Sequence, residues 1–373
     1  MRVFFSNLGC KLNQAELEGL SRKFSSSGYI IATSLEEADI HVVNTCTVTH
    51  VAARQSRRLA RQGRRLNPKL RTVLTGCYAT SDPHEASSLC GVDLIVPNHL
   101  KNQLVERVQE NWPPHRGTLL PEDPDLPVPY VPLAFGNTRA LVKIEDGCNM
   151  RCSFCIIPDT RGRQKSRKIG EILEEVQELV QRGSREVVVT GVQISAYRSG
   201  RSGLYDLVKK LLQYTRVGRL RLTSIAPWDF DLRLLDLFDH DPPRLCRHFH
   251  LSLQSGSATT LRRMRRPYGP SEFGELVSAI RERVPGVAIT TDIIVGFPGE
   301  TEREFQETLN FADRCNFARI HAFPYSPRPG TAAAEFSDQV PFPVKKLRME
   351  RLLLRADSTA EKFAEGNLDR WAQ

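Results

Sequence analysis

Cys148, Cys152 and Cys155 are the three residues whose types and spacing point most directly to chemistry. Their CxxxCxxC spacing supplies three thiolates, whereas a four-iron cluster has four iron corners. One iron is then left without a protein ligand. An open iron can bind a small molecule through an amine and a carboxylate and pass it an electron, which a fully ligated electron-transfer cluster does not do. The spacing predicts a [4Fe-4S] cluster that takes part in a reaction.

Two other uses of these cysteines fit the sequence less well. A structural zinc site normally takes four ligands, often as two CxxC pairs, and neither a second pair nor a close pair of histidines stands near Cys155. A disulfide framework is disfavoured because nine cysteines in 373 residues, without a signal peptide, describe a reducing, cytoplasmic setting. The strand-like run at 140–144 would present the cysteine loop at its end.

A second group of cysteines lies in the first hundred residues. Cys10, Cys46 and Cys77 each follow a strand-like run, in a turn that contains glycine or asparagine. Because the C-terminal ends of parallel strands share one edge of a sheet, these residues can converge at one crevice. Three buried structural thiols are the alternative, but the matching positions favour a second three-cysteine [4Fe-4S] cluster. The cysteines without this pattern are expected to be packing residues: Cys90, Cys246 and Cys315.

The composition fits a soluble globular protein with a polyanionic partner. Hydrophobic residues make up 40% of the chain and charged residues 25%. No apolar stretch approaches the roughly 18 residues of a membrane span, so no membrane partner and a cytoplasmic location are expected. The 52 Lys and Arg exceed the 43 Asp and Glu, which gives a net charge of +9.

Much of the positive charge is concentrated between residues 54 and 71, where no acidic residue occurs. Helical spacing places five guanidinium groups along one face: Arg54, Arg57, Arg58, Arg61 and Arg65. A solvated surface helix is the alternative, but the absence of alternating glutamates favours phosphate binding. These arginines are therefore candidates for RNA binding. A shorter basic run at 262–266 could equally be a group of cations at a helix end.

The pattern of strands and helices that must position these residues predicts an α/β fold. Residues 1–112 alternate short apolar runs with helical patterns, which predicts an N-terminal doubly wound parallel sheet domain. Its strands are expected at 3–8, 29–32, 39–44, 72–75 and 93–96. The helix that begins at Gln14 should end at Gly28.

A proline-rich segment separates this domain from the rest of the chain. Seven prolines between residues 111 and 135 exclude a helix or an inner strand, so residues 113–135 are expected to form an extended linker. Alternation resumes at residues 136–340, with six strands expected at 141–145, 186–190, 220–224, 249–253, 288–295 and 319–323. They predict an incomplete (βα)6 barrel with its site at the strand C-termini. Residues 341–373 should form a helical segment from Val344.

These features together resemble the methylthiotransferase branch of the radical S-adenosylmethionine (SAM) enzymes, over residues 4–332. The cysteine segments 8–14, 44–49 and 76–79 look like those of the MtaB subgroup. That subgroup modifies N6-threonylcarbamoyladenosine at position 37 of tRNA. The resemblance implies two [4Fe-4S] clusters, one on each group of three cysteines, with SAM bound at Cys148, Cys152 and Cys155.

The resemblance also implies which residues hold SAM at the barrel mouth. Segments 190–193, 250–257 and 291–300 match the family and follow predicted strands. The implied SAM contacts are Gly191, Gln193, Ser252, Gln254, Ile294, Gly296 and Phe297. Apart from the clusters, no catalytic residue is implied. Asp159, Arg161 and Arg163 are candidates for substrate contacts because they follow the cluster loop.

The activity implied by the resemblance is insertion of a methylthio group at C2 of the modified adenosine. One SAM molecule methylates sulfur held at the N-terminal cluster, and a second is cleaved reductively to a 5′-deoxyadenosyl radical. Radical chemistry suits an inert C2–H bond that no side-chain base could deprotonate at neutral pH. The implied partners are tRNA and an electron donor such as flavodoxin or ferredoxin.

Some observations leave other functions open. The family's small C-terminal β-barrel domain, which grips RNA, is expected to be absent because the sequence stops at Gln373. Ala226 stands where relatives often carry Glu, and Gln193 where Asn or His is common. Another tRNA adenosine or a ribosomal protein residue is an alternative substrate. A non-catalytic metal-cluster protein that binds RNA is the alternative from a different class.

Overall fold

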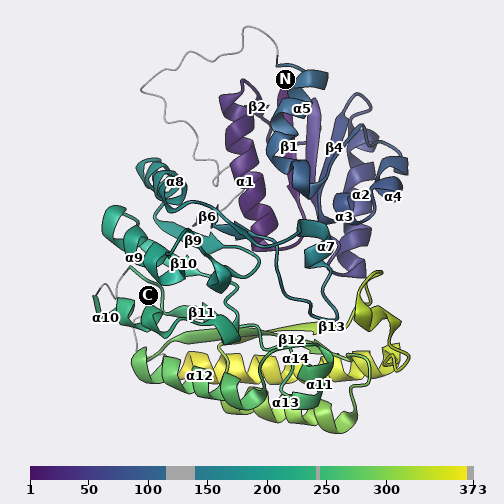
Figure 1. Cartoon of the computed structure of the whole chain (residues 1–373). Coiled ribbons are helices and arrows are strands. Elements are labelled where there is room, and N and C mark those ends of the chain that lie inside the picture. Colours follow the sequence, from purple (N-terminus) through teal and green to yellow (C-terminus); the bar gives the residue numbers. More distant parts are fainter. Residues whose placement is uncertain (115–138, 241–243, 368–373) are drawn as a thin grey trace.

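The computed structural model describes residues 1–114, 139–240 and 244–367. The expected linker at 113–135 therefore lies almost wholly outside the described residues. In the described ranges the chain forms an upper α/β domain and a lower curved set of strands and helices, stacked along one axis (Figure 1).

The N-terminal half contains a parallel sheet of five described strands in the order β2-β1-β3-β4-β5. The strands are β1 (Arg2–Asn7), β2 (Ile30–Ile31), β3 (Ile40–Thr45), β4 (Arg71–Gly76) and β5 (Leu94–Val96). The main helices are α1 (Lys11–Ser26), α2 (His50–Leu66), α3 (Cys77–Ser81), α4 (Pro83–Ser88) and α5 (Leu104–Asn111). All five strands lie within about two residues of their predicted positions.

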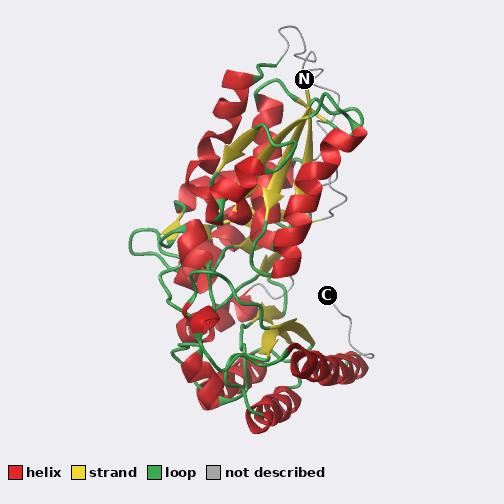
Figure 2. Ribbon diagram, turned by 90° about the vertical axis from the view of Figure 1, so that its right-hand side faces the viewer, coloured by secondary structure: helices red, strands yellow, loops and turns green. Residues whose placement is uncertain are grey.

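Helices cover both faces of this sheet (Figure 2). On one face, Leu17, Phe24 and Leu104 from α1 and α5 pack against β1. On the other face, Ala53 and Ala60 of α2 pack against β3 and β4. The prediction of a doubly wound sheet is confirmed, because helices pack against apolar strand residues on both faces of the parallel sheet.

The second half contains six parallel strands in chain order. They are β6 (Arg139–Lys143), β9 (Glu186–Thr190), β10 (Arg219–Leu222), β11 (His248–His250), β12 (Ala288–Val295) and β13 (Arg319–Pro324). They form two three-stranded sheets, β10-β9-β6 and β11-β12-β13. Isolated bridges join β10 to β11, one of them between Ile225 and Leu251. The incomplete barrel is therefore confirmed, with a discontinuity between its third and fourth strands.

The barrel helices form the outer layer. They are α8 (Ile169–Gln181), α9 (Leu204–Tyr214), α10 (Leu237–His240), α11 (Ala258–Arg263), α12 (Pro270–Arg283), α13 (Glu302–Cys315) and α14 (Phe342–Glu365). Outward-facing aliphatic residues such as Val142, Val189 and Leu222 join them in the main hydrophobic core. The C-terminal helix expected from Val344 is α14, which packs along β13 (Figure 1). No helix in the described part of the chain is long and apolar enough to cross a membrane.

Helix α1 connects the two halves. It lies between the N-terminal sheet and the barrel edge (Figure 1), where Ala15 packs against Leu141 of β6 and Val188 of β9. Below this apolar contact, the carboxylate of Glu16 pairs with Lys101 at 2.6 Å and with Lys143 at 3.0 Å. The buried charge cluster fixes the N-terminal domain on the open edge of the barrel.

Candidate active site

The loop 147–156, between the short strand β7 (Glu145–Asp146) and helix α7 (Ile157–Arg161), brings the three barrel cysteines together. Burial, together with the nearby sulfurs of Cys152 and Cys148, raises the pKa of the Cys155 thiol to about 12. Gly147 has a φ of +74°, and a Cβ there would collide with the backbone of Gly162. Glycine is therefore required at this position, because the start of the loop passes close to the backbone of Gly162 after α7.

Arg266 supports the middle cysteine of this loop. Its Nη1 atom lies 3.3 Å from Cys152 Sγ, and its Nη2 donates to the carbonyl oxygen of Ser252 at 3.3 Å. The guanidinium carbon lies 4.8 Å from the Trp228 ring centroid, and Tyr268 flanks it at 5.7 Å. The run at 262–266 thus contributes a cation to the cluster loop. Sequence reasoning missed this role because the run looked like a helix end.

The expected SAM contacts lie at the C-terminal ends of the barrel strands. After β9, the Gln193 Oε1 atom lies 3.8 Å from Cys148 Sγ. Gln254 has a φ of +68°, and its carbonyl oxygen accepts from the backbone nitrogen of Ile294 at 2.9 Å. Phe297 is fully buried, with its ring centroid 6.4 Å from that of Phe154 in the cysteine loop. Gln193 and Phe297 therefore lie beside the loop.

Glycines and a buried glutamate complete this region. The backbone nitrogen of Gly296 donates to Glu300 at 2.6 Å. A Cβ on Gly191 would collide with the carboxylate of Glu145, which accepts from the backbone nitrogen of Gln193. Burial raises the pKa of Glu145 to about 7, and its Oε2 atom is buried without a partner among the described residues. Glu145 was not predicted as a site residue because it comes before the cysteine motif in the sequence.

The N-terminal cysteines also converge. Cys10 precedes α1, Cys46 follows β3, and Cys77 begins α3 directly after β4. A Cβ on Gly9 would lie 2.8 Å from Cys46 Sγ. Burial raises the pKa of the Cys46 thiol to about 11, and the nearby Cys77 and Cys10 sulfurs also raise it. The prediction that three strand ends bring these thiols to one edge agrees with this arrangement.

Contacts at α7 connect the surroundings of Cys10 and Cys77 to the barrel. The Nη2 atom of Arg161 donates to Asn13 Oδ1 at 2.5 Å, one turn after Cys10. The Nδ2 atom of Asn98 donates to the Thr160 carbonyl oxygen at 2.9 Å and lies 3.7 Å from Cys77 Sγ. Helix α7 follows the barrel cysteine loop directly. It therefore contacts both cysteine groups.

Arg161 is not available for a substrate contact. Its side chain is 1% exposed, and its Nη1 atom bonds Glu16 at 3.0 Å and Asp146 at 2.8 Å. We therefore assign it to the interface between the two halves of the chain. Asp159 and Arg163, the other two candidates, are exposed.

The residues present fit [4Fe-4S] clusters better than single metal ions. Thiolates on one tetrahedral zinc ion lie about 3.8 Å apart, given Zn–S bonds of about 2.3 Å. Across the described ranges, no three His, Cys, Asp or Glu side chains are placed to hold one metal ion. Each group offers three free thiols, a donor set that suits a cluster which presents a different iron to each thiolate and keeps one iron open.

The predicted basic face lies on α2. Arg54, Arg58, Arg61 and Arg65 are exposed. Arg57 differs from them, because its guanidinium lies 5.7 Å from the Tyr78 ring and 3.5 Å from Glu85. The apolar side of the helix, with Ala53 and Ala60, faces the sheet. Four of the five candidates are therefore free to meet a ligand.

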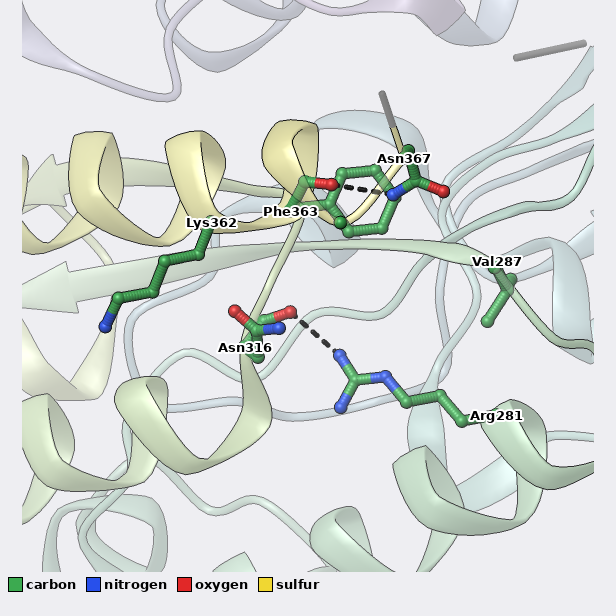
Figure 3. A pocket seen from close by; sticks show the side chains of 8 residues that line it. Arg281, Val287, Asn316, Lys362, Phe363 and Asn367 are labelled. Atoms are coloured by element: carbon green, nitrogen blue, oxygen red, sulfur yellow. Dashed lines mark hydrogen bonds between the residues drawn. The ribbon is translucent and has the colours of Figure 1, made fainter. Parts of the chain in front are cut away.

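A pocket of about 220 Å³ is lined by residues just before β12 and β13 and at the end of α14, among them Val287, Asn316 and Phe363 (Figure 3). Arg281 of α12 donates to the carbonyl oxygen of Asn316 at 2.8 Å, and Asn367 donates to that of Phe363 at 2.6 Å. The first bond joins α12 to the residue that follows α13, and the second closes the last turn of α14. We assign the pocket to the packing of the barrel base.

The fold and the two cysteine groups define a radical SAM protein with an additional N-terminal domain. The Radical SAM superfamily pattern matches residues 142–312, and that of the Uncharacterized protein family UPF0004 matches residues 2–97. A solved structure, the radical S-adenosylmethionine methyltransferase TsrM from Kitasatospora setae, has the same fold with a TM-score of 0.63 at 16% sequence identity. The match covers 89% of this chain and 77% of TsrM.

Curated relatives are more specific. The Bacillus subtilis (strain 168) protein "Threonylcarbamoyladenosine tRNA methylthiotransferase MtaB" is 37% identical, over 97% of this chain and 82% of its own length. The protein of the same name from Aquifex aeolicus (strain VF5) is 38% identical, over 98% and 90%. The chain therefore belongs to the radical SAM methylthiotransferase family and is similar to MtaB members over nearly its whole length.

Membership in this family has two consequences. SAM and [4Fe-4S] clusters are the cofactors of the chain. The protein is an enzyme, so the non-catalytic alternative is wrong.

Proposed function

We propose that the protein inserts a methylthio group at C2 of N6-threonylcarbamoyladenosine at position 37 of tRNA. The single observation that carries this proposal is the pair of three-cysteine groups, one on each half of the chain, joined through α7. Thr160 of that helix bonds Asn98 beside Cys77, and Arg161 bonds Asn13 beside Cys10. A shared helix gives the two groups a fixed relative position, which a two-site reaction on one base needs.

Each cysteine group has its own part in the proposal. A [4Fe-4S] cluster on Cys148, Cys152 and Cys155 would bind SAM at its open iron and supply the electron that cleaves SAM to a radical. Cys10, Cys46 and Cys77 would hold a second cluster, which would carry the sulfur that is inserted into the base. The purine C2–H bond is too weakly acidic for a side-chain base, so a radical route is required.

Residues of the barrel mouth would bind and orient SAM. The unpartnered Oε2 atom of Glu145 is an acceptor suited to the ammonium group of SAM. Gly191 leaves room beside this carboxylate, and Gln193 lies between it and Cys148. The remaining proposed SAM contacts lie at or just after the C-terminal ends of β11 and β12: Ser252, Gln254, Ile294, Gly296 and Phe297.

The protein surface supports an RNA substrate. The exposed cations of α2, Arg54, Arg58, Arg61 and Arg65, occur without acidic residues on that helix. Phosphate groups are the ligands that such a face attracts. A flavodoxin or ferredoxin is the proposed electron donor, because reductive cleavage of SAM consumes one electron at a low potential.

The proposed function is tested with anaerobically reconstituted protein, SAM, a sulfide source, a reductant and tRNA that carries N6-threonylcarbamoyladenosine. Nucleosides are then analysed by mass spectrometry. We expect the methylthio form of the modified adenosine from the wild-type protein, and none from a Cys10→Ala or a Cys152→Ala variant. Methylthio product only on a dimethylallyl-modified adenosine or on a ribosomal protein would overturn the substrate assignment.

A further inference from the structure

The N-terminal domain contacts both the first and the last strand of the incomplete barrel. At the first strand, β6, Ala15 of α1 packs against Leu141. At the last strand, β13, the contact comes from residues 325–333, which follow this strand and which we call the bridging turn. In Figure 1 the chain after β13 rises toward the lower end of α2. The domain is therefore attached to the barrel on two sides.

Arg328 joins the bridging turn to the loop that follows Cys46. Its Nη1 atom donates to the carbonyl oxygen of Thr47 at 3.0 Å, and its Nη2 atom donates to Ser326 Oγ at 3.3 Å. The same hydroxyl accepts from the backbone nitrogen of His50 at 3.2 Å. Arg328 is only 5% exposed. A buried guanidinium with these partners ties the backbone beside Cys46 to the end of the barrel.

The other end of the bridging turn contacts the barrel cysteine loop. The backbone nitrogen of Ala333 donates to the carbonyl oxygen of Ser153, the residue after Cys152, at 2.7 Å. Between the two ends, Thr331 Oγ1 donates to the carbonyl oxygen of Arg328 at 2.7 Å and closes a tight turn. The bridging turn therefore connects the residue after Cys46 to the residue after Cys152 through a short stretch of bonded backbone.

The start of the bridging turn is fixed on the barrel. The backbone nitrogen of Tyr325 donates to the carbonyl oxygen of Val295 at the end of β12, at 2.8 Å. The Tyr325 ring lies 5.3 Å from the Phe297 ring, centroid to centroid, and Lys345 Nζ donates to the Tyr325 carbonyl oxygen at 3.2 Å. Because β12 and α14 both hold this residue, the barrel determines where Arg328 lies.

We propose that Arg328 is a positioning residue, which holds the Cys46 loop at a fixed distance from the barrel cysteines. This inference rests on the proposed function, in which sulfur held by the N-terminal cysteines must meet a base activated at the barrel. The contacts at α7 hold the surroundings of Cys10 and Cys77, and Arg328 holds those of Cys46. A displacement of about 1 Å between reacting groups can slow a reaction on the order of a hundredfold.

The first test measures how SAM is used by an Arg328→Gln variant. With tRNA that carries N6-threonylcarbamoyladenosine, the variant should still cleave SAM, because Arg328 bonds the Cys46 loop and not the barrel cysteines. The ratio of 5′-deoxyadenosine to methylthio product should rise about tenfold to a hundredfold. Arg328→Lys keeps the charge but loses the planar fork of donors, so it should show the same change. A wild-type ratio in Arg328→Lys would mean that charge alone matters, and would overturn the inference.

The second test measures the distance between the two cysteine groups. In the reduced, reconstituted protein both clusters are paramagnetic, and their dipolar coupling in electron paramagnetic resonance depends on their separation. The wild-type protein should give one well-defined coupling, and Arg328→Gln a weaker and broader one. The inference requires both this change and the change in SAM use, so a variant that lacks either one would overturn it.

Hydrogen exchange on the metal-free protein separates local release from unfolding. In Arg328→Gln the peptide that contains His50 should exchange about tenfold faster, as expected for one lost hydrogen bond, and peptides of α1 should exchange as in the wild-type protein. If Arg328→Gln unfolds, Arg328→Lys carries both tests.

The control is Arg355→Gln, a half-exposed arginine of α14 that pairs with Asp313 at 3.2 Å. It should match the wild-type protein in every measurement. If the wild-type protein forms the methylthio nucleoside and the Arg328 variants use SAM as it does, only this inference fails. If the wild-type protein does not form that nucleoside, the proposed function fails, and the dipolar coupling still tests the position that Arg328 imposes.

Discussion

Arg266 links the cysteine loop to the strand end at Ser252 through a single guanidinium group. It lies beside Cys152 Sγ and beside the stacked rings of Trp228 and Tyr268. A positive hydrogen-bond donor at a cluster thiolate stabilises the more negative, reduced state of the cluster. Arg266 therefore acts on the cluster that activates SAM, although it contributes no ligand to it.

Replacing Arg266 with Gln should lower the reduction potential of the cluster on Cys148, Cys152 and Cys155. The expected shift is on the order of 50 mV, which corresponds to about 1 kcal/mol for one electron and is typical of a lost charge-assisted hydrogen bond. A potentiometric titration followed by electron paramagnetic resonance measures it. SAM cleavage should slow in parallel.

The matched control for this experiment is Arg262→Gln. Arg262 belongs to the same basic run but is exposed, and it bonds only Thr259 at 3.0 Å. Its potential should equal that of the wild-type protein. An unchanged potential in the Arg266 variant would show that the guanidinium supports the loop without influencing the cluster.

At the residue scale, motif spacing predicted the cysteines but not the side chains that serve them. Cys148, Cys152 and Cys155 are close in sequence, so the sequence alone predicted that they lie together in the fold. Arg266 and Glu145 lie on either side of the motif in sequence and reach it only through the fold. Arg161 was a candidate for substrate contact, since sequence position could not show that Glu16 and Asp146 surround it.

At the element scale, α1 determines how the two halves meet. Glu16 accepts from Lys101, Lys143 and Arg161, and its side chain is 3% exposed. Although burial opposes its ionisation, these cations hold the pKa of Glu16 well below its ordinary range. A buried carboxylate with three cationic partners is costly to remove because its partners stay behind unpaired.

Replacing Glu16 with Gln should lower the free energy of unfolding by about 3 kcal/mol or more at pH 7. The carboxyl pKa is depressed in the folded protein, so its stabilisation is present above the unfolded value of about 4.3 and is lost as the pH falls below it. The difference between wild-type and variant should therefore shrink from pH 5 to pH 3. Anaerobic urea denaturation at several pH values measures both effects.

Glu171→Gln provides the comparison for this change. Glu171 is 52% exposed and lies 3.9 Å from Arg167 on the surface of α8. Its replacement should change stability by no more than about 0.5 kcal/mol at any of these pH values. A Glu16 variant as stable as this control would mean that α1 is held by its apolar contacts alone.

Strand positions were predictable at this scale, whereas their pairing was not. A run rich in Val marked β9, whose five residues are all buried because both of its faces are covered. At the break between β10 and β11, the two sheets are joined by a bridge between Ile225 and Leu251, which are distant in the sequence. The docking of α1 on β6 depends on Ala15, a residue with no distinctive signal of its own.

At the scale of the whole molecule, the cysteine groups and the basic face of α2 belong to one enzyme that must hold a folded RNA. Charge reversal of Arg54, Arg58 and Arg61 to Glu should weaken tRNA binding more than tenfold and flatten its salt dependence. Arg57 is left intact because it contacts Tyr78 and Glu85. Binding titrations at several salt concentrations measure the affinity and its slope.

Reversal of two cations on α13 and α14, Arg303→Glu and Lys346→Glu, controls for charge reversal elsewhere on the surface. Their side chains are 90% and 68% exposed. These helices lie at the far end of the molecule from α2 (Figure 1). Equal loss of binding in both variants would point to a general charge effect and against a defined RNA face.

The measurement that tests the central claim most directly is the iron and sulfide content after anaerobic reconstitution. Two [4Fe-4S] clusters predict about eight irons and eight sulfides per chain in the wild-type protein. Replacing Cys10, Cys46 and Cys77 with Ala should leave about four irons, and replacing Cys148, Cys152 and Cys155 should also leave about four. A wild-type count near four, or a count that the first triple variant leaves unchanged, would contradict the second cluster and with it the insertion of sulfur.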